Sequence, residues 1–424
     1  QMEDPSQAKG LVKRDIIRVV TPGTVIESSM LSEDKNNYLC SVYCKRTRGR
    51  WRAGICFADI STGEAYATEL NAEKIGAAII TELCRYMPSE ILICTPMLDF
   101  KDVTAYVKQH TNALVELRED ACYKDSVMQA TMTDQFGENW RETLHYEADA
   151  LVPYAVAAMI NYLHETQKHG VERIRTVQNY ADAQYMRLSP VTRANLELTE
   201  TMRGREKKGT LLWVLDKTET SMGKRLLRSW IEQPLVDAEA INRRLGAVQA
   251  LYTSTMARAE LKEALNHVFD IERLTTRILY GSATPREVKA LGDTCAMLPQ
   301  VKAQAASCGA PLLSALAEQI DLLEDILQSI TTAIVDDPPA SLKDGGAIRT
   351  GYNAEVDELR DIMHGGKGVL SELETRLRQE TGIPKLKIGF NRVFGYYIEV
   401  SNSYKNQVPE GFIRKQTLTS GERY

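Results

Sequence analysis

Three carboxylates in the first quarter of the chain could hold metal ions for phosphodiester hydrolysis. Asp59 ends a strand-like run, Glu64 follows it across a short turn, and Asp99 comes after a second apolar run. Two divalent metals held by carboxylates can activate a water molecule against a phosphodiester. The competing interpretation is that Asp59 caps the turn while the other two carboxylates are solvated. No further carboxylate stands at a recognisable spacing, which favours the structural interpretation.

Two other patterns come close to chemical motifs without completing them. Gly204 and Gly209 have the spacing of a phosphate-binding loop, but Thr210 stands where that loop needs lysine, so we interpret the segment as a polar surface loop. The eight cysteines include no CxxC pair and no Cys/His cluster at zinc spacing. They are typical of reduced thiols in a cytosolic protein.

A local excess of positive charge marks residues 381–424. This segment has seven basic and three acidic residues, whereas the whole chain carries a net charge of −5. Two runs with alternating apolar residues, joined at Asn391 and Arg392, predict a β-hairpin with one apolar face. We expect Tyr396 to belong to its core rather than to stack on a base. A basic hairpin suits contact with a phosphate backbone, which supplies affinity without sequence specificity.

A heptad repeat precedes the basic segment and predicts a long helix over residues 353–380. Such a seam is typical of a lever that lies beside a partner helix. Gly365, Gly366 and Gly368 interrupt it, so we expect a weak or bent point there. The apolar positions of the seam are Val356, Leu359, Met363, Leu370, Leu373 and Leu377.

The elements that would position these groups differ between the two halves of the chain. Residues 38–44, 53–60 and 64–70 alternate as strands, and helix and strand patterns follow up to residue 117. This order predicts an α/β domain over residues 17–150. From residue 152 the pattern is almost wholly helical, with Asp237 as a cap and a capping box at Thr284.

Residues 208–235 are the centre of the helical half. Residues 211–215 are apolar nearly all round, which predicts burial on several sides. A helix with one apolar face begins at Ser221, and Pro234 ends it because proline has no N–H to continue the backbone bonding. The pattern indicates a segment around which the other helices pack, and it contains no catalytic or binding motif.

Composition limits the class of protein. With 424 residues the chain can form two or three domains. No apolar run approaches the ~18–20 residues that cross a bilayer. The net charge of −5 argues against a protein that coats nucleic acid generally, so any DNA contact needs a local patch. The chain opens on Gln1 and stops at Tyr424 directly after a strand-like run, and we therefore expect a piece of a larger protein.

The amino-acid sequence of several segments resembles the MutS mismatch-repair family. LSPVTRANLELTETMRG, KKGTLLWVLDKTETSMGKRLLRSWIEQPL, INRRLGAVQAL and DIERLTTRILYGSATPREV resemble its core domain. QMEDPSQAKGLVKRDIIRVVTPGTV resembles the end of its mismatch-binding domain and the strand that follows. GFNRVFGYYIEVS and IRKQTLTSGERY resemble its clamp domain, which grips duplex DNA away from the mismatch.

The resemblance implies a multidomain α/β plus mainly α architecture. Residues 1–16 would end the mismatch-binding domain, and residues 17–150 would form a connector of ribonuclease-H-like topology. Residues 151–352 would form a helical core, 353–380 the lever helix, and 381–424 a small β clamp. Phe136, Gly137 and Glu138 copy the family's mismatch-reading Phe-x-Glu, but they lie in the wrong domain, and we interpret them as a chance match.

The resemblance also implies a function and contact residues. The parent protein would form a homodimer around mispaired DNA, use ATP and Mg²⁺ to become a sliding clamp, and recruit MutL in the cytoplasm, near the nucleoid. This piece would be a monomer or weak dimer without a cofactor, catalytic residue, metal or membrane contact, and Ala130 and Thr131 would face MutL. The family often has lysine where Thr419 stands, so this chain departs from the family pattern at that position. The DNA-backbone contacts carried over are Asn391, Arg392, Arg414, Lys415, Gln416, Thr417, Thr419 and Ser420.

Two alternatives stay open at this point. A ribonuclease-H-like nuclease would show Mg²⁺-dependent cleavage that is lost on changing Asp59. A purely structural helical scaffold, paired through its heptad seam, would dimerise with concentration and have no affinity for DNA.

Overall fold

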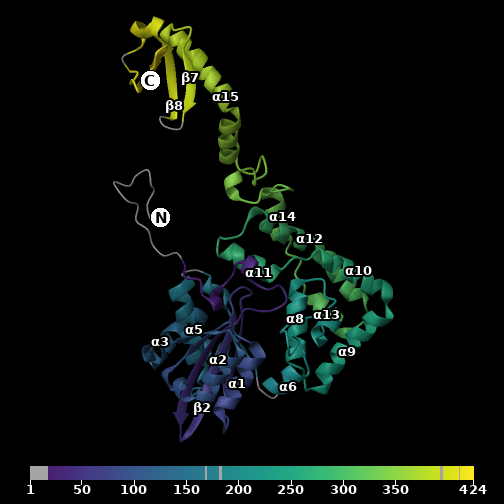
Figure 1. The fold of residues 1–424 in the computed structure, drawn as a ribbon. Helices are drawn as coiled ribbons and strands as arrows, with labels where there is room; N and C mark the ends of the chain where they lie inside the picture. The colour runs from purple at the N-terminus through teal and green to yellow at the C-terminus, as the bar shows by residue number, and fades with distance from the viewer. Residues whose placement is uncertain (1–17, 168–169, 181–183, 392–394, 410) are drawn as a thin grey trace. The chain divides into compact units, whose positions relative to one another are not determined.

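Alternating apolar residues between positions 39 and 70 form three antiparallel strands, and these build the larger of two sheets (Figure 1). The computed structural model describes residues 18–167, 170–180, 184–391, 395–409 and 411–424. The chain divides into two units. The first contains the described residues up to Thr331 together with Asp336–Gly345, and the second contains Thr332–Val335 and Gly346–Tyr424. The expected end of a mismatch-binding domain at residues 1–16 lies outside the described residues.

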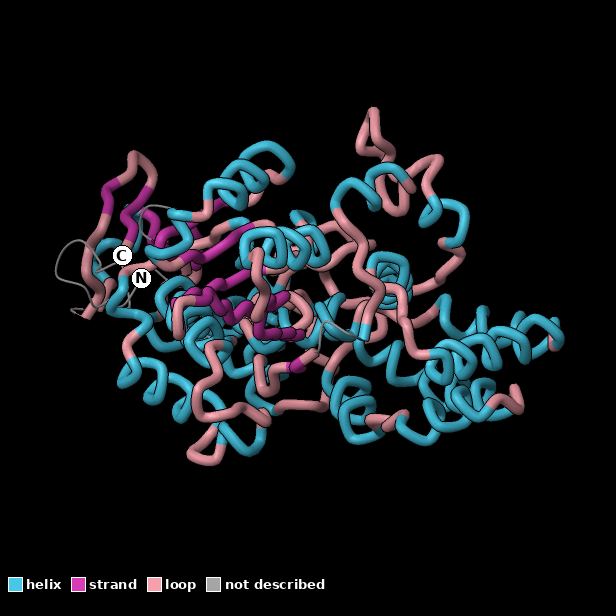
Figure 2. Tube along the Cα trace, turned by 90° about the horizontal axis from the view of Figure 1, so that it is seen from below, coloured by secondary structure: helices cyan, strands magenta, loops and turns pink. Residues whose placement is uncertain are grey.

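The sheet of the first unit has six strands in the order β5-β4-β1-β2-β3-β6. β4 and β5 run parallel to β1, and β6 runs parallel to β3. Figure 2 shows the strands with helices around them. The strands are β1 (Leu39–Thr47), β2 (Arg50–Asp59), β3 (Glu64–Leu70), β4 (Glu90–Ile93), β5 (Leu114–Leu117) and β6 (Gln178–Asn179).

Helices cover both faces of this sheet because successive strand residues point to opposite sides. Leu39 packs in one core with Met128 of α3 and Ile160 of α5. Its neighbour Cys40 packs in the other core with Ile79 of α1. The helices of this part are α1 (Ile75–Tyr86), α2 (Lys101–His110), α3 (Asp125–Phe136), α4 (Trp140–Thr143) and α5 (Val152–Gln167).

The packing corrects the boundary expected at residue 150. α5 begins at Val152, yet its apolar residues belong to the core beneath the sheet. Gly54 of β2 lies so close to α5 that an added Cβ would fall 2.4 Å from the Leu151 carbonyl oxygen. β6 then pairs with β3. The sheet and its helices therefore continue to about residue 180, and a division at 150 would cut through one core.

The helical part of the first unit begins at α6, and local capping explains many of its starts. The side chains of Thr210, Thr220, Asp237 and Asp270 each accept a backbone N–H at the start of a helix. The capping box at Thr284 is confirmed. The helices are α6 (Pro190–Asn195), α7 (Leu211–Leu215), α8 (Ser221–Glu232), α9 (Ala238–Thr253), α10 (Thr255–Asn266), α11 (Ile271–Leu279), α12 (Pro285–Ser307), α13 (Pro311–Gln319) and α14 (Glu324–Ala333).

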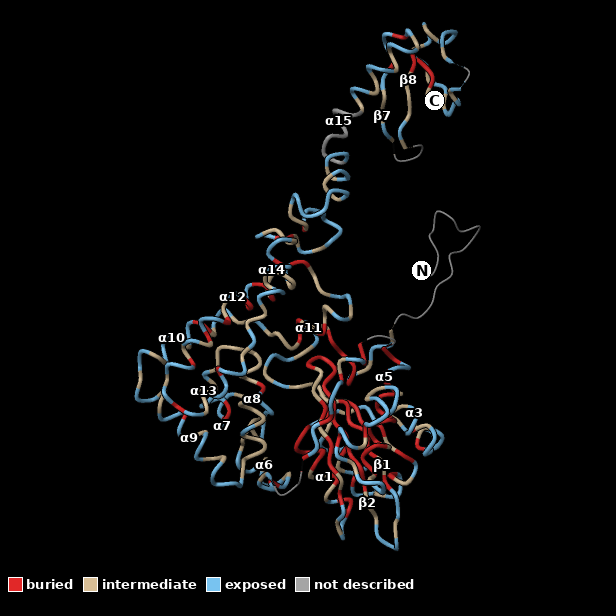
Figure 3. Tube along the Cα trace, turned by 180° about the vertical axis from the view of Figure 1, so that it is seen from behind, coloured by how far each residue is buried: buried red, intermediate tan, exposed pale blue. Residues whose placement is uncertain are grey.

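The expected burial of residues 211–215 is wrong. Only Leu212 is buried, at 1% exposure, while Trp213 is 48% exposed and Val214 is 57% exposed. α7 is a five-residue helix with one face against its neighbours, and no described segment covers its other sides. Figure 3 shows the same contrast more widely, because buried positions gather around the sheet and the helices α7–α10 are mostly half-buried or exposed.

The predicted lever is α15 (Ala354–Thr381), in the second unit. The Asn353 side chain caps its first turn, and Gly382 ends it with a positive φ of 67°. The helix continues through Gly365, Gly366 and Gly368 without a break. Along the seam, Leu377 packs against the buried cluster of Ile383, Leu386 and Val400, while Leu359 is exposed.

The predicted clamp forms a four-stranded sheet in the order β7-β8-β10-β9. The expected hairpin is confirmed, with β7 and β8 antiparallel. Ile383, Leu386 and Val400 are the buried centre of this sheet. The strands are β7 (Lys387–Asn391), β8 (Gly395–Ser401), β9 (Gln416–Thr417) and β10 (Gly421–Arg423).

Short 3₁₀ helices complete the described elements. Within the described residues, no helix is both long and apolar enough to cross a membrane. The 3₁₀ helices are η1 (Pro22–Thr24), η2 (Ser28–Met30), η3 (Thr95–Asp99), η4 (Asp120–Tyr123), η5 (Val171–Arg173), η7 (Leu342–Asp344) and η8 (Asn402–Gln407).

Candidate nucleic-acid interface

Polar side chains line the β9 edge of the second unit's sheet. The Lys415 N–H bonds the Arg423 carbonyl at 2.8 Å, which joins the start of β9 to β10. The Leu418 N–H bonds the Gly421 carbonyl at 2.8 Å and closes the turn between these strands. This backbone pairing leaves five of the predicted contact residues exposed to solvent, namely Arg414, Lys415, Thr417, Thr419 and Ser420.

Glu422 neutralises two of the cations beside this edge. Its carboxylate lies 2.6 Å from the Lys405 ammonium and 3.1 Å from the Arg414 guanidinium, and its side chain is only 3% exposed. The Tyr424 hydroxyl donates to it at 2.7 Å. Hydrogen bonds from Lys405, then Tyr424 and Arg414, outweigh burial and hold the pKa of Glu422 at about 2. Arg414 is therefore a predicted contact residue whose charge already has a partner.

A second carboxylate engages Arg423. The Arg423 Nε donates to Glu399 at 3.0 Å, and its NH1 donates to the Gln416 side-chain oxygen at 3.1 Å. The guanidinium also stacks over the Tyr397 ring, 4.3 Å from its centroid. Because Gln416 is held in this group and is only half-exposed, it is less available to DNA than its neighbours on the edge.

Asn391, another predicted contact, lies elsewhere on the sheet. Asn391 ends β7, where it pairs with Gly395 across the hairpin. β7 and β9 are the two edge strands, and strands lie about 4.8 Å apart, so Asn391 and Thr417 are separated by about 14 Å or more. Arg392 lies outside the described residues. The structure thus brings the residues from 414 to 420 together but does not bring Asn391 to them.

The expectation that Tyr396 belongs to the core is wrong. Tyr396 is 64% exposed, and its cross-strand partner Phe390 is 61% exposed. Their ring centroids lie 5.1 Å apart. The hydrophobic cluster of this unit includes Ile398 and Val400 of the hairpin but neither Phe390 nor Tyr396.

Ala130 and Thr131, the predicted partner contacts, lie on α3 in the first unit. Ala130 is exposed, whereas Thr131 is half-buried. The Thr131 hydroxyl lies 2.9 Å from the Val127 carbonyl and 3.0 Å from the Asn161 side-chain oxygen. Thr131 therefore fastens α3 to α5, and Ala130 is the member of the pair that a partner can reach.

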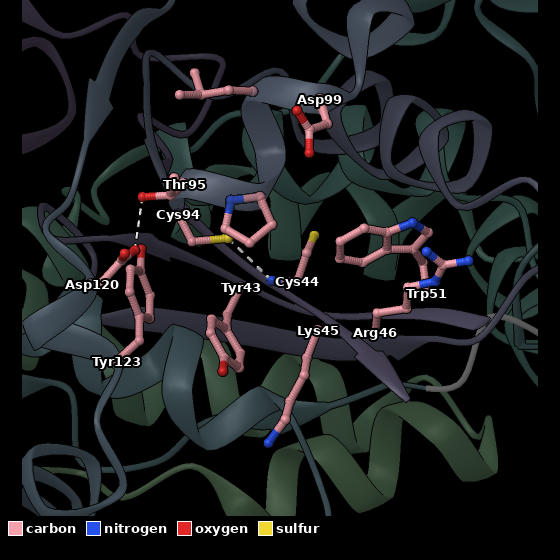
Figure 4. A pocket seen from close by; sticks show the side chains of 12 residues that line it. Tyr43, Cys44, Lys45, Arg46, Trp51, Cys94, Thr95, Asp99, Asp120 and Tyr123 are labelled. Carbon is pink, nitrogen blue, oxygen red and sulfur yellow. Dashed lines mark hydrogen bonds between the residues drawn. The ribbon is translucent and has the colours of Figure 1, made fainter. Parts of the chain in front are cut away.

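The carboxylates considered for metal binding do not form a site. Asp59 is fully buried and accepts bonds from the Ser61 N–H, the Ser61 hydroxyl and the Asn37 N–H, as the turn-capping interpretation predicted. Asp99 lines a pocket of about 590 Å³ with Lys45 (Figure 4). Asp59 ends β2 beside the start of β1, at the opposite end of these strands from the pocket, because β1 and β2 are antiparallel. Across the described residues, no three His, Cys, Asp or Glu side chains are placed to hold a metal ion.

The glycine-bounded loop at residues 204–210 is a surface turn that ends in a helix cap. The Thr210 hydroxyl donates to the Lys207 carbonyl at 2.6 Å and accepts the Trp213 N–H at 3.1 Å. Thr210 is 1% exposed. These residues do not fit a nucleotide phosphate. Phe136, considered above as a chance match to a mismatch reader, ends α3 and packs against the core beneath the sheet.

Comparison with known proteins matches most of the chain. Residues 1–29, 37–175 and 191–394 match the family models of MutS domain I, MutS domain II and MutS domain III. The DNA mismatch repair protein MutS of Ruminiclostridium cellulolyticum is 44% identical over the whole chain, which covers 48% of that relative. That of Alkaliphilus oremlandii is 42% identical, with 48% of it covered, and that of Clostridium perfringens is 41% identical, with 45% covered.

The chain spans about half the length of the curated relatives that it matches. The mixed α/β part and the helical part coincide with MutS domains II and III. The order of the three matches along the chain is the order in which the domains are numbered. The chain belongs to the MutS family.

Proposed function

We propose that this chain is the scaffold and duplex-gripping part of a protein that initiates DNA mismatch repair. The observation that carries the proposal is the similarity over all 424 residues to proteins named DNA mismatch repair protein MutS. In the parent, we expect recognition of mispaired duplex DNA, homodimerisation, and conversion to a sliding clamp by ATP and Mg²⁺. We place the parent in the cytoplasm, with the nucleoid. Because residues 204–210 do not fit a nucleotide phosphate, no ATP-dependent step is assigned to the described residues.

The β9 edge is the proposed contact with the DNA backbone. Lys415 is exposed and, in the described part of the chain, has no carboxylate partner. Thr417, Thr419 and Ser420 add hydroxyl groups beside it, and such groups commonly bond phosphate oxygens. One free cation and three hydroxyls support weak, sequence-independent binding that depends on salt.

The sheet and its covering helices, up to about residue 180 of the first unit, are proposed to be the connector of the parent. The strand order β3-β2-β1-β4-β5, antiparallel and then parallel, supports the ribonuclease-H-like topology. We propose that the exposed side of α3, around Ala130, faces a MutL-like partner. The nuclease alternative is not supported, because Asp59 and Asp99 lie at opposite ends of the β1 and β2 strands.

A salt titration tests the function. We would measure binding of the chain to a plain duplex and to the same duplex with one G·T mispair, between about 50 and 300 mM salt. The expected result is equal and weak binding to both, with log K falling linearly against log salt. A clear preference for the mispair would refute the assignment to backbone gripping alone. Absence of binding at the lowest salt would refute DNA contact by this part of the protein.

A further inference from the structure

The β1–β2 hairpin carries a concentration of cations that the proposed function does not use. Residues 45–52 read KRTRGRWR, with five basic and no acidic residues in eight positions. The rest of the chain is acidic enough to give a net charge of −5. A run of this kind is an electrostatic footprint for a polyanion when it is held on a rigid element.

The hairpin extends beyond the strands on either side of it. β4 pairs with β1 only as far as Val42, and β3 pairs with β2 only from Ala53 onward. Residues 43–52 therefore form a two-stranded ribbon without neighbouring strands (Figure 1). The major groove of B-DNA, about 12 Å wide, accommodates a two-stranded β-ribbon of this kind.

The sequence keeps positive charge at positions where it is unfavourable. Lys45 stands directly opposite Arg52 in the register, and the pairing of Arg52 with Asp149 and Glu69 offsets the repulsion that like charges in such a pair cause. Arg48 has a φ of 51° and Gly49 has a φ of 83°, so both occupy the left-handed region of a tight turn. Asn or Gly is preferred at the first of these positions, and arginine there is strained. Protection of an edge strand would need only one or two charges, of either sign.

Most of these cations are free. Arg52 at the base of the ribbon bonds Asp149 at 2.8 Å and also Glu69, which fixes the ribbon to the first unit. Lys45, Arg48 and Arg50 are exposed and have no carboxylate within ion-pair distance in the described part of the chain.

The two faces of the ribbon are both basic. Strand alternation puts Lys45 and Arg50 on one face, while Arg46 lies on the other beside Trp51 (Figure 4). Trp51 packs edge-on against Phe100, with ring centroids 5.2 Å apart, and this contact stiffens the ribbon.

We propose that residues 45–52 form a second binding element for duplex nucleic acid, distinct from the β9 edge. The charges bind phosphates from within or across a groove. Guanidinium groups favour phosphate because their planar forks can donate two parallel bonds to it. An acidic protein surface would also attract the cations, but a two-stranded ribbon without a neighbouring strand matches the width of a DNA groove. The inference does not depend on the clamp, because the ribbon belongs to the other unit.

The test is a salt titration with a plain duplex of about 30 base pairs, long enough for several phosphate contacts. The ribbon variant is Lys45→Gln/Arg48→Asn/Arg50→Gln, in which asparagine suits the positive φ of the turn. Each phosphate contact contributes about 0.9 to the slope of log K against log salt. The expected result is a slope smaller by about 3 and binding weaker by about tenfold or more at 100 mM salt.

Two matched variants separate charge from structure. Lys101→Gln/Lys108→Gln/Lys124→Gln removes three exposed lysines from the same unit and changes the net charge equally, and it is expected to leave the slope nearly unchanged. Arg48→Lys/Arg50→Lys keeps the charge of the ribbon and is expected to keep the slope. An equal fall in slope for the ribbon variant and the three-lysine control would overturn the proposal, as would an unchanged slope for the ribbon variant.

Two further measurements distinguish the other outcomes. If poly-L-glutamate displaced the labelled duplex more effectively than unlabelled duplex at equal charge, the ribbon would be a site for an acidic protein and the proposal would be wrong. The clamp variant Lys415→Gln is titrated in parallel. An effect of Lys415→Gln without an effect of the ribbon variant leaves the clamp proposal standing and overturns the ribbon. The reverse result supports DNA binding by the ribbon and refutes DNA binding by the β9 edge.

Discussion

Arg225 and Asp270 form a two-bond ion pair that joins α8 to the start of α11. The Arg225 NH1 and NH2 nitrogens lie 2.7 and 2.8 Å from the two carboxylate oxygens. The same carboxylate caps α11 by accepting the Arg273 N–H at 3.3 Å. Arg225 also bonds Glu272 at 2.6 Å, and its side chain is 4% exposed. One buried guanidinium therefore holds two carboxylates at a helix terminus.

Replacing this arginine should destabilise the first unit strongly. In Arg225→Met the carboxylates of Asp270 and Glu272 lose their cation while still partly shielded from water. Removing one partner of a buried pair costs about 3 kcal/mol or more. The check is the urea midpoint of the first unit's unfolding. Lys262→Met is the control, because Lys262 is 60% exposed in its pair with Glu219 and should matter by less than about 1 kcal/mol. Equal effects of the two variants would contradict the prediction.

Asp34 should make the first unit sensitive to acid. Burial alone would raise its pKa, but bonds from Ser32 and Lys207 and the charge of Arg228 lower it from 3.8 to about 2. A lowered folded-state pKa gives stability that is present above pH 4 and is lost as the pH falls toward 2. Asp34→Asn should reduce the unfolding free energy at pH 7 by about 1 kcal/mol, discounted for partial exposure, and flatten the profile below pH 4.

The neighbouring carboxylate is the control for Asp34. Glu33 lies 3.3 Å from Lys224, but its side chain is 75% exposed. Glu33→Gln should change the unfolding free energy by less than about 0.5 kcal/mol and keep the acid profile. Both profiles can be measured by urea unfolding at a series of pH values. An Asp34→Asn profile as steep as the unchanged chain's would exclude Asp34 as the source of acid sensitivity.

A single methyl group at Gly54 should disrupt the packing of α5 on the sheet. An added Cβ would lie 2.4 Å from the Leu151 backbone and 2.6 Å from the Val152 nitrogen, and neither atom can move without shifting the helix. Gly54→Ala should therefore lower the unfolding free energy by about 3 kcal/mol. Gly246→Ala, on exposed α9 with nothing within 4 Å, should raise it by up to about 1 kcal/mol. Thermal unfolding of both variants checks this prediction, because their unfolding free energies should change with opposite signs.

Features that depend on a few neighbouring residues could be predicted from the sequence. The cap at Asp237, the capping box at Thr284 and the β7–β8 hairpin all formed as expected. Each depends on side-chain chemistry and alternation within one or two turns of chain. The turn at Asp59 belongs to the same class, because its hydrogen bonds to Ser61 are local.

Burial and charge pairing could not be predicted because they depend on distant partners. An apolar run shows that a segment can be buried, but nothing in its own residues supplies a covering element for Trp213 or Tyr396. Counting charges likewise missed that Glu422 holds Lys405 and Arg414. The basic run at residues 45–52 was visible in the sequence, yet its meaning depends on a strand register that leaves it without neighbours.

The β9 edge should gain DNA affinity when a lysine replaces Thr419. Thr419 is exposed, in the turn beside Lys415. Thr419→Lys adds one phosphate contact and should increase the slope of log K against log salt by about 0.9, while Lys415→Gln should decrease it by about the same amount. Fluorescence anisotropy with a plain duplex measures both. If both variants kept the slope of log K against log salt of the unchanged chain, this edge would not contact phosphate.

Glu422 should weaken DNA binding by the clamp. Its pKa of about 2 keeps it ionised throughout the range from pH 5 to 8, so it pairs with Lys405 and Arg414 under all ordinary conditions. Glu422→Gln keeps a hydrogen-bond acceptor for Tyr424 but removes the charge that holds the two cations. Lys405 and Arg414, which are 50% and 58% exposed, would then be free for phosphate. The slope of log K against log salt should steepen by up to about 2, with tighter binding at low salt.

Glu399→Gln is the matched control on the same sheet, because it frees only Arg423, which stays stacked on Tyr397. If Glu422→Gln weakened binding while the sheet stayed folded by circular dichroism, the carboxylate would be orienting Arg414 toward DNA rather than withholding it.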